Sequence, residues 1–167
     1  PEAIISNLLT FLGKEGTLAM PAIPMFPDSP KITERMTADV SHLILDYDPI
    51  NTPAWTGVLP NTMIKYPNSL RSLHPLNSMI AIGLEAEEMM KGNLFGEKPT
   101  PCGLNSSWYY CYRRNAKIVA VGTDLAHSLT MIHVAEDILG DNWNVPNWYR
   151  ERKFRILCND YKYKDRN

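Results

Sequence analysis

The chain has 167 residues, a length that predicts one domain with a buried core. Its 17 basic and 18 acidic residues give a net charge of -1, so there is no broad basic field of the kind that binds nucleic acid or a membrane surface. The sequence contains no run of about eighteen apolar residues, which argues against a membrane-spanning helix.

The cysteines and the first residues bear on where the protein works. Cys102, Cys111 and Cys158 show no paired spacing, so we expect reduced thiols in a cytoplasmic protein. The stretch PEAIISNLLTFLGKEG carries acidic residues and lacks the basic start of a signal peptide. Pro1 suits the first turn of a helix, and no strand comes before it.

The first third of the chain predicts a helix, a strand and a long irregular region. Apolar residues recur at helical spacing over 4–12, and Gly13 ends this helix. Thr17–Met20 predicts a short buried strand, and the proline-rich stretch after it predicts a loop. Residues 33–45 fit a helix, or a loop followed by a strand. The turn-rich stretch DYDPINTPAWTGVLP leads into a helix of about two turns over 56–65.

Short apolar strands and helices continue in the middle of the chain. Ser78–Ile82 predicts a buried strand or a transition from sheet to helix, and Leu84–Lys91 predicts a helix. Ser106 or Ser107 is placed to cap the helix WYYCYRRN. The stretch KIVAVG, residues 117–122, is the clearest strand signal of the chain.

The last part of the chain predicts one more helix and one more strand. The stretch TDLAHSLTMIHVAEDILG indicates a loop and a helix that ends at Gly140. ERKFRILCN alternates charged and apolar residues, which is typical of an exposed strand. Residues 161–167 predict a polar tail after a single domain over 1–160.

This alternation of helices and short strands indicates an α/β or α+β fold, with helices packed on a mixed sheet. The sequence has no Gly-x-Gly-x-x-Gly and no Gly-x-x-x-x-Gly-Lys-[Ser/Thr] loop. The usual cradles for phosphate are therefore absent from it.

Two short motifs carry side chains that suit chemistry. In Arg71-Ser72-Leu73-His74-Pro75, an arginine that holds an anion stands beside a donor and a histidine that can pass a proton. The alternative is a loop whose polar groups bond to the backbone. His133 and Glu136 share a helix face, so they could form a base and its orienting carboxylate, a pair of metal ligands, or a surface ion pair. No third ligand has a supporting spacing, so we expect no metal.

Cys102 is a third candidate, in the stretch TPCGLNS. A nucleophilic cysteine needs a partner base and a positive environment, and neither is visible near it in the sequence. We expect a loop residue that at most lines a site.

The order of six stretches is more specific than any single motif. GTLAMPA, YDPINTPAWTGVLP, RSLHPLNSMIAIG, PCGLNSSW, KIVAVG and TMIHVAE follow one another along the chain. This order resembles the aminoglycoside 3-N-acetyltransferase family, also called the antibiotic N-acetyltransferase family. The most specific parts are Arg71-Ser-x-His74-Pro75 and Thr130-x-x-His133-x-x-Glu136.

The resemblance implies an α/β/α sandwich with a mixed sheet, and a soluble enzyme of antibiotic resistance. Family members move an acetyl group from acetyl-CoA to an amine of an aminoglycoside or another amino sugar, by direct attack in a ternary complex. A protein base removes the proton of the amine, and hydrogen-bond donors stabilise the oxyanion. Acetyl-CoA and a small-molecule amine are the implied partners, with no metal, nucleic acid or membrane, and a homodimer is left open.

Site roles follow from the matching positions in the family motifs. The implied catalytic residues are His74, His133 and Glu136. The implied cofactor-binding residues are Arg71, Ser72, Ser78 and Thr130. For the acceptor, Asn105, Glu97 and Asp137 are the candidates.

Two departures from the family pattern qualify these roles. Resistance enzymes of the family have a histidine shortly before a Gly-x-x-Ser-Pro motif, whereas no histidine lies between Pro75 and Ala126 here. The family's N-terminal strand, and a loop that helps to bind CoA, would lie before Pro1. The competing hypothesis is therefore a non-catalytic relative that binds CoA or a sugar ligand.

Overall fold

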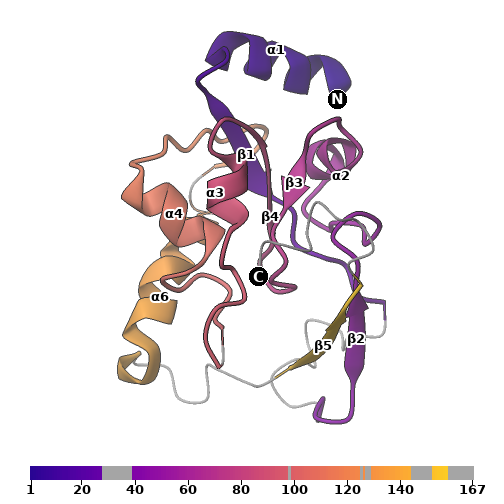
Figure 1. Cartoon of the computed structure of the whole chain (residues 1–167), viewed down its shortest axis with the longest axis vertical. Coiled ribbons are helices and arrows are strands. Elements are labelled where there is room, and N and C mark those ends of the chain that lie inside the picture. The colour runs from indigo at the N-terminus through magenta and orange to yellow at the C-terminus, as the bar shows by residue number, and fades with distance from the viewer. Residues whose placement is uncertain (28–38, 98, 125, 127–128, 144–151, 158–167) are drawn as a thin grey trace.

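The computed structural model, drawn in Figure 1, has a small central sheet with helices around it and a separate pair of strands below. The structure describes residues 1–27, 39–97, 99–124, 126, 129–143 and 152–157.

The central sheet is built on β4 (Met79–Gly83), which has a neighbour on each side. β1 (Thr17–Pro21) pairs with it antiparallel, with Ala19 opposite Ala81. β3 (Leu70–Arg71) pairs antiparallel on its other edge. The second sheet has β2 (Ile44–Tyr47) parallel to β5 (Lys153–Ile156). Both the expected strand at 17–20 and the expected strand at 78–82 are confirmed.

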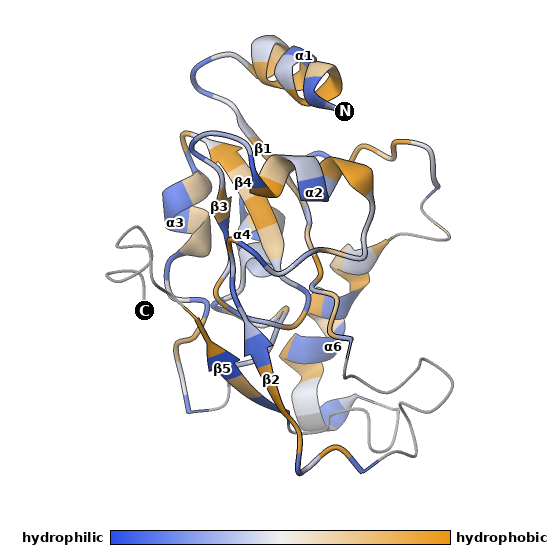
Figure 2. Ribbon diagram, turned by 90° about the vertical axis from the view of Figure 1, so that its right-hand side faces the viewer, coloured by the Kyte–Doolittle hydropathy of each residue, from blue (hydrophilic) through white to orange (hydrophobic). Residues whose placement is uncertain are grey.

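Helices cover both faces of β4, and its alternating side chains explain why. Met79 and Ala81 belong to a core cluster with α3 (Ala86–Met90), α4 (Ser107–Arg113) and α6 (His133–Leu139). Ile80 and Ile82 belong to a second cluster with α1 (Glu2–Leu12) and α2 (Val58–Ile64). Because successive strand residues point to opposite faces, an unbroken apolar run marks a strand buried on both sides. Figure 2 shows β4 as a hydrophobic strand inside the molecule. The predicted α/β/α arrangement is confirmed.

Local signals set several helix ends as expected. The Ser106 side chain accepts a hydrogen bond from the Tyr109 amide at 3.0 Å, so Ser106 is the N-cap of α4. A 3-10 turn over Thr130–Ile132 leads into α6, and Gly140, with φ 53°, ends it. Another 3-10 turn covers Gly140–Asn142.

One expected strand is wrong. Residues 117–122 form no strand and lie exposed, with 51% of Ile118 and 73% of Val119 accessible. A strand needs a neighbour to satisfy its backbone, and no strand in the described ranges pairs with this stretch. For residues 33–45, expected as a helix or as a loop followed by a strand, 33–38 fall outside the described residues and a strand begins at Ile44. The tail over 161–167 also falls outside the described residues, and the single domain over 1–160 stays a prediction.

Candidate functional site

The guanidinium of Arg71 lies inside the protein, with 1% of the residue exposed. Its Nε donates to the Ala22 carbonyl at 3.1 Å and to Ser78 Oγ at 3.2 Å. Its terminal nitrogens donate to the carbonyls of Ala22 and Thr52. The guanidinium carbon lies 5.4 Å from the centroid of the Tyr47 ring, within range of a cation–π contact. Arg71 therefore joins β3 to the end of β1 and to the turn after β2.

The serines around Arg71 also bond to the protein itself. Ser78 Oγ donates to the Ala22 carbonyl at 2.6 Å, and Ser72 Oγ accepts the Met79 amide at 3.1 Å. Tyr47 donates its hydroxyl to the Ser72 carbonyl at 2.7 Å. Three of the four residues expected to bind CoA are thus buried and hydrogen-bonded to protein atoms. In this arrangement they do not fit as direct contacts to a nucleotide.

His74 is also buried, and both of its ring nitrogens contact the backbone. Nε2 lies 2.9 Å from the Pro99 carbonyl, and Nδ1 lies 3.2 Å from the Leu76 amide nitrogen. A neutral ring with its proton on Nε2 donates the first bond and accepts the second. Burial lowers the pKa of His74 below its ordinary value, which favours this neutral form.

The second motif lies on α6 and presents a paired carboxylate and imidazole. His133 Nδ1 contacts Glu136 Oε2, and Glu136 is buried whereas His133 is partly exposed. Next to this pair, Asp137 Oδ2 accepts the Cys102 amide at 2.6 Å. Thr130 is partly buried in the turn that leads into α6. The expected sharing of a helix face by His133 and Glu136 is confirmed by their contact.

The two motifs meet on one connecting segment, residues Pro99–Gly103. His74 reaches it through the Pro99 carbonyl, and Asp137 reaches it through the Cys102 amide. Asn77, in the turn before β4, donates its side-chain amide to Cys102 Sγ at 3.5 Å. Trp108 Nε1 in turn donates to the Asn77 carbonyl at 2.6 Å. Sequence patterns gave no signal for Asn77 or Trp108 at this junction.

Cys102 is unsuited to act as a nucleophile. The residue is fully buried, and burial raises the pKa of its thiol to about 12, with the carboxylates of Asp137 and Glu136 adding to the effect. Burial also raises the pKa of Cys111 to about 11. Since the thiolate is the reactive form, neither thiol supports a covalent acyl-enzyme near neutral pH.

The remaining candidates lie at the surface. Glu97 is exposed, in the loop after α3. Asn105 is also exposed; its backbone carbonyl accepts from Asn93 at 3.0 Å, and its side chain lies 3.5 Å from the Phe95 carbonyl. Asp137, by contrast, is partly buried.

Two surface hollows lie elsewhere. The larger one, about 620 Å³, lies beside α2 and is lined in part by Asn61, Thr62, Lys65 and Tyr66. A hollow of about 290 Å³ is lined in part by Phe26, Asp46 and Thr52. No sequence pattern points to the first hollow, because its polar residues follow no motif.

The described residues were compared with the side-chain clusters that hold metal ions and with the helices that cross membranes. Within those ranges, no three His, Cys, Asp or Glu side chains gather in a way that could hold a metal ion. None of the helices in them is both long and apolar enough to cross a bilayer.

Comparisons with known proteins agree with the motif order. The family model described as aminoglycoside 3-N-acetyltransferase matches residues 1–165. A structure of AAC-IIIb in a binary complex with CoASH is 25% identical, with a TM-score of 0.63, and the match covers 82% of this chain and 51% of that chain. The aminoglycoside acetyltransferase AAC(3)-IIb is 25% identical, with a TM-score of 0.64 and coverage of 87% and 52%.

A third structure supports the fold alone. The aminoglycoside acetyltransferase AAC(3)-Xa is 22% identical, with a TM-score of 0.65, and the match covers 96% of this chain and 60% of that chain. The chain thus spans about half the length of the solved structures that it matches.

Proposed function

The chain belongs to the aminoglycoside 3-N-acetyltransferase family, and from this premise we propose that it serves the transfer of an acetyl group from acetyl-CoA to an amine of an aminoglycoside or another amino sugar. AAC-IIIb, a similar structure that holds CoASH, supports acetyl-CoA as the co-substrate in this proposal. The observation that carries the chemistry is the contact between His133 and Glu136 on α6.

Their geometry suits proton removal from an amine. Glu136, which is buried, holds Nδ1 of the imidazole and so fixes the orientation of the ring. Nε2 of His133 would then take the proton of the attacking amine, and the carboxylate would stabilise the imidazolium that forms. The amine nitrogen forms the new C–N bond while the C–S bond of the thioester breaks. The imidazolium returns the proton to the departing sulfur, so CoA leaves as its thiol.

His74 supports this site structurally in the proposal. A general base needs a ring nitrogen within reach of the substrate, whereas both nitrogens of His74 contact backbone groups inside the protein. Among the three expected catalytic residues, His133 and Glu136 are therefore the better candidates for the proton transfer.

Acceptor binding is the proposed role of exposed groups near the same segment. Aminoglycosides are polycations, so carboxylates and amide oxygens are suitable partners for them. Glu97 lies just before Pro99–Gly103 in the chain, and Asn105 lies just after it. Both residues are exposed.

The test is acetyl transfer by the purified chain. CoA release from acetyl-CoA is followed with a panel of aminoglycosides, and the product is identified by mass spectrometry. Glu136→Gln should lower kcat by about a hundredfold or more, with little change in the KM for the acceptor. Glu88→Gln, an exposed carboxylate on α3, is the matched control. CoA binding without any transfer would favour the non-catalytic relative instead.

A further inference from the structure

We propose that Asp137 is a positioning residue, whose carboxylate anchors the Pro99–Gly103 segment between the two motifs instead of binding the acceptor. The expected effect of Asp137 on the rate of acetyl transfer rests on the proposed function. The anchor itself can be observed without any activity.

The first support is the geometry of the contact. Asp137 Oδ2 accepts the Cys102 amide at 2.6 Å, a short bond of the kind that a charged acceptor makes. The anchored residue is fully buried and belongs to the core cluster that includes Trp108 and Val134. Leaving a buried amide without an acceptor is destabilising, so this backbone group requires a partner.

The second support is the tightness of the segment. A Cβ at Gly103 would lie 2.1 Å from Thr100 Oγ1 and 4.0 Å from the Asp137 side chain. The turn therefore packs closely against the Thr100 side chain and lies within van der Waals range of the Asp137 Cβ.

The third support is that the segment is held at two ends. His74 fixes its first residue through the Pro99 carbonyl at 2.9 Å, and Asp137 fixes Cys102. The first anchor comes from the turn before β4, and the second comes from the helix that carries His133 and Glu136. A fixed segment between them sets the distance from one motif to the other.

This arrangement separates two roles that one carboxylate could have. An acceptor-binding carboxylate works through its charge on a cationic amine. An anchor needs only an oxygen that accepts the Cys102 amide. Asparagine keeps such an oxygen and loses the charge, whereas alanine loses both.

The decisive experiment compares Asp137→Asn with Asp137→Ala in the full chain. We expect the Cys102 amide proton of the wild type to lie far downfield in a 1H–15N spectrum. Asp137→Asn should keep part of the downfield shift, and Asp137→Ala should abolish it. Glu88→Gln should leave this resonance unchanged.

The kinetic arm uses the same variants with the aminoglycosides that the wild type acetylates. Asp137→Asn should stay within about threefold of the wild-type kcat, whereas Asp137→Ala should lose about a hundredfold, the effect of a misplacement of about 1 Å. Equal loss in both variants, with a raised acceptor KM, would overturn the proposal in favour of acceptor binding.

The two arms fail independently. A Cys102 resonance that ignores Asp137→Ala overturns the anchor, whatever the activity. If the wild-type chain has no transferase activity, the proposed function is overturned, but the spectrum still tests the contact between Asp137 and the Cys102 amide. If Asp137→Ala does not fold, Asp137→Ser supplies a shorter side chain whose oxygen lies farther from the amide, and the same loss of the downfield shift is expected.

Discussion

Two stretches of the chain have nearly the same composition, but one is a buried strand and the other is exposed and irregular. β4 has the sequence MIAIG, and residues 117–122 have the sequence KIVAVG. Ile80 in β4 is 1% exposed, whereas Val119 in the second stretch is 73% exposed. Both stretches suit a strand that is apolar on its two faces, yet only one is a strand.

The difference lies in the neighbours. β4 has β1 and β3 along its edges and a helical layer over each face. Residues 117–122 follow α4 and have no strand beside them among the described residues. Apolar side chains favour a strand only where the tertiary structure supplies partners for the backbone and cover for both faces.

The largest expected contrast comes from truncating one apolar side chain in each stretch. Ile80→Ala removes buried atoms from the cluster that includes Ile5 and Met63, and should lower the free energy of unfolding by about 2–5 kcal/mol. Val119→Ala should change it by less than about 0.5 kcal/mol, because the side chain is exposed. Denaturant unfolding of both variants measures the difference. A similar cost for the two would show that residues 117–122 are packed in solution.

The next contrast compares Arg71, the buried basic residue in the strand beside β4, with Lys117 in the exposed stretch. Arg71→Ala removes the guanidinium that bonds to the carbonyls of Ala22 and Thr52, and should cost on the order of 3 kcal/mol. Arg71→Lys should recover little of this, because one ammonium cannot reproduce the planar fork. Lys117→Ala, at an exposed position, should be nearly neutral. Full stability in Arg71→Lys would contradict the proposed importance of the fork.

A smaller effect depends on pH and again concerns the buried region. Burial holds the pKa of His74 below about 6.5 in the folded protein, so the unfolded chain binds more protons below that pH. The free energy of unfolding should therefore fall as the pH drops below about 6.5, by at most about 1.4 kcal/mol per pH unit from this group.

Two histidine variants isolate this effect. His74→Gln should reduce the pH slope measured by denaturant unfolding between pH 7 and pH 5. His42→Gln, at an exposed position, should retain the slope of the wild type. Equal slopes in the wild type and His74→Gln would contradict a buried neutral ring.

Local signals in the sequence account for what could be predicted. The periodicity of α1, the Ser106 cap and the apolar run of β4 each require only neighbouring residues to be interpreted. The order of the motifs identified the family, and helical spacing placed His133 beside Glu136.

The failures share a different cause, which is contact across long stretches of chain. The inward turn of Arg71 depends on Ala22 and Thr52, and the anchor at Cys102 depends on Asp137. The motif RSLHP shows which side chains are polar, but it does not show that backbone carbonyls elsewhere will bond to them. Whether residues 117–122 form a strand likewise depends on a neighbouring strand elsewhere in the chain, and a local sequence pattern cannot show whether such a neighbour exists.

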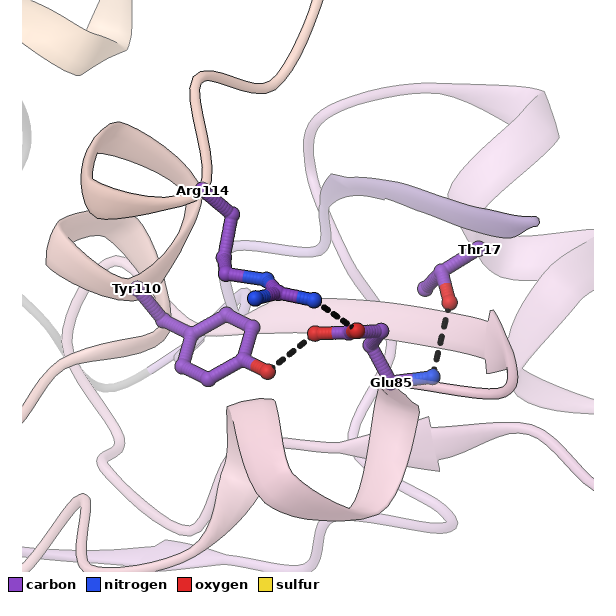
Figure 3. A network of polar contacts seen from close by, with 4 residues as sticks. All are labelled: Thr17, Glu85, Tyr110 and Arg114. Carbon is purple, nitrogen blue, oxygen red and sulfur yellow. Dashed lines mark hydrogen bonds and ion pairs between the residues drawn. The ribbon is translucent and has the colours of Figure 1, made fainter. Parts of the chain in front are cut away.

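The smallest expected effect concerns the polar network that links the end of β4 to the helix before residues 117–122. Figure 3 shows Glu85, just after β4, with its carboxylate facing Tyr110 of α4 and Arg114, which directly follows α4. The Tyr110 hydroxyl and the Arg114 guanidinium both donate to the Glu85 carboxylate, and the Glu85 amide donates to Thr17 Oγ1 at 2.8 Å. The hydrogen bond from Tyr110, followed by Arg114, lowers the pKa of Glu85.

The dependence of stability on salt distinguishes the two side-chain contacts of this network. Arg114 is largely exposed, so its attraction to Glu85 is screened by ions, and the small destabilisation by Arg114→Ala should vanish in about 1 M NaCl. Tyr110 is less exposed and its bond is directional, so the effect of Tyr110→Phe should persist in the same salt. Thermal unfolding at low and high salt measures both. If the effect of Arg114→Ala persists in high salt, the guanidinium packs onto α3 and the end of β4. The network would then hold the two compared regions together by packing and not by charge.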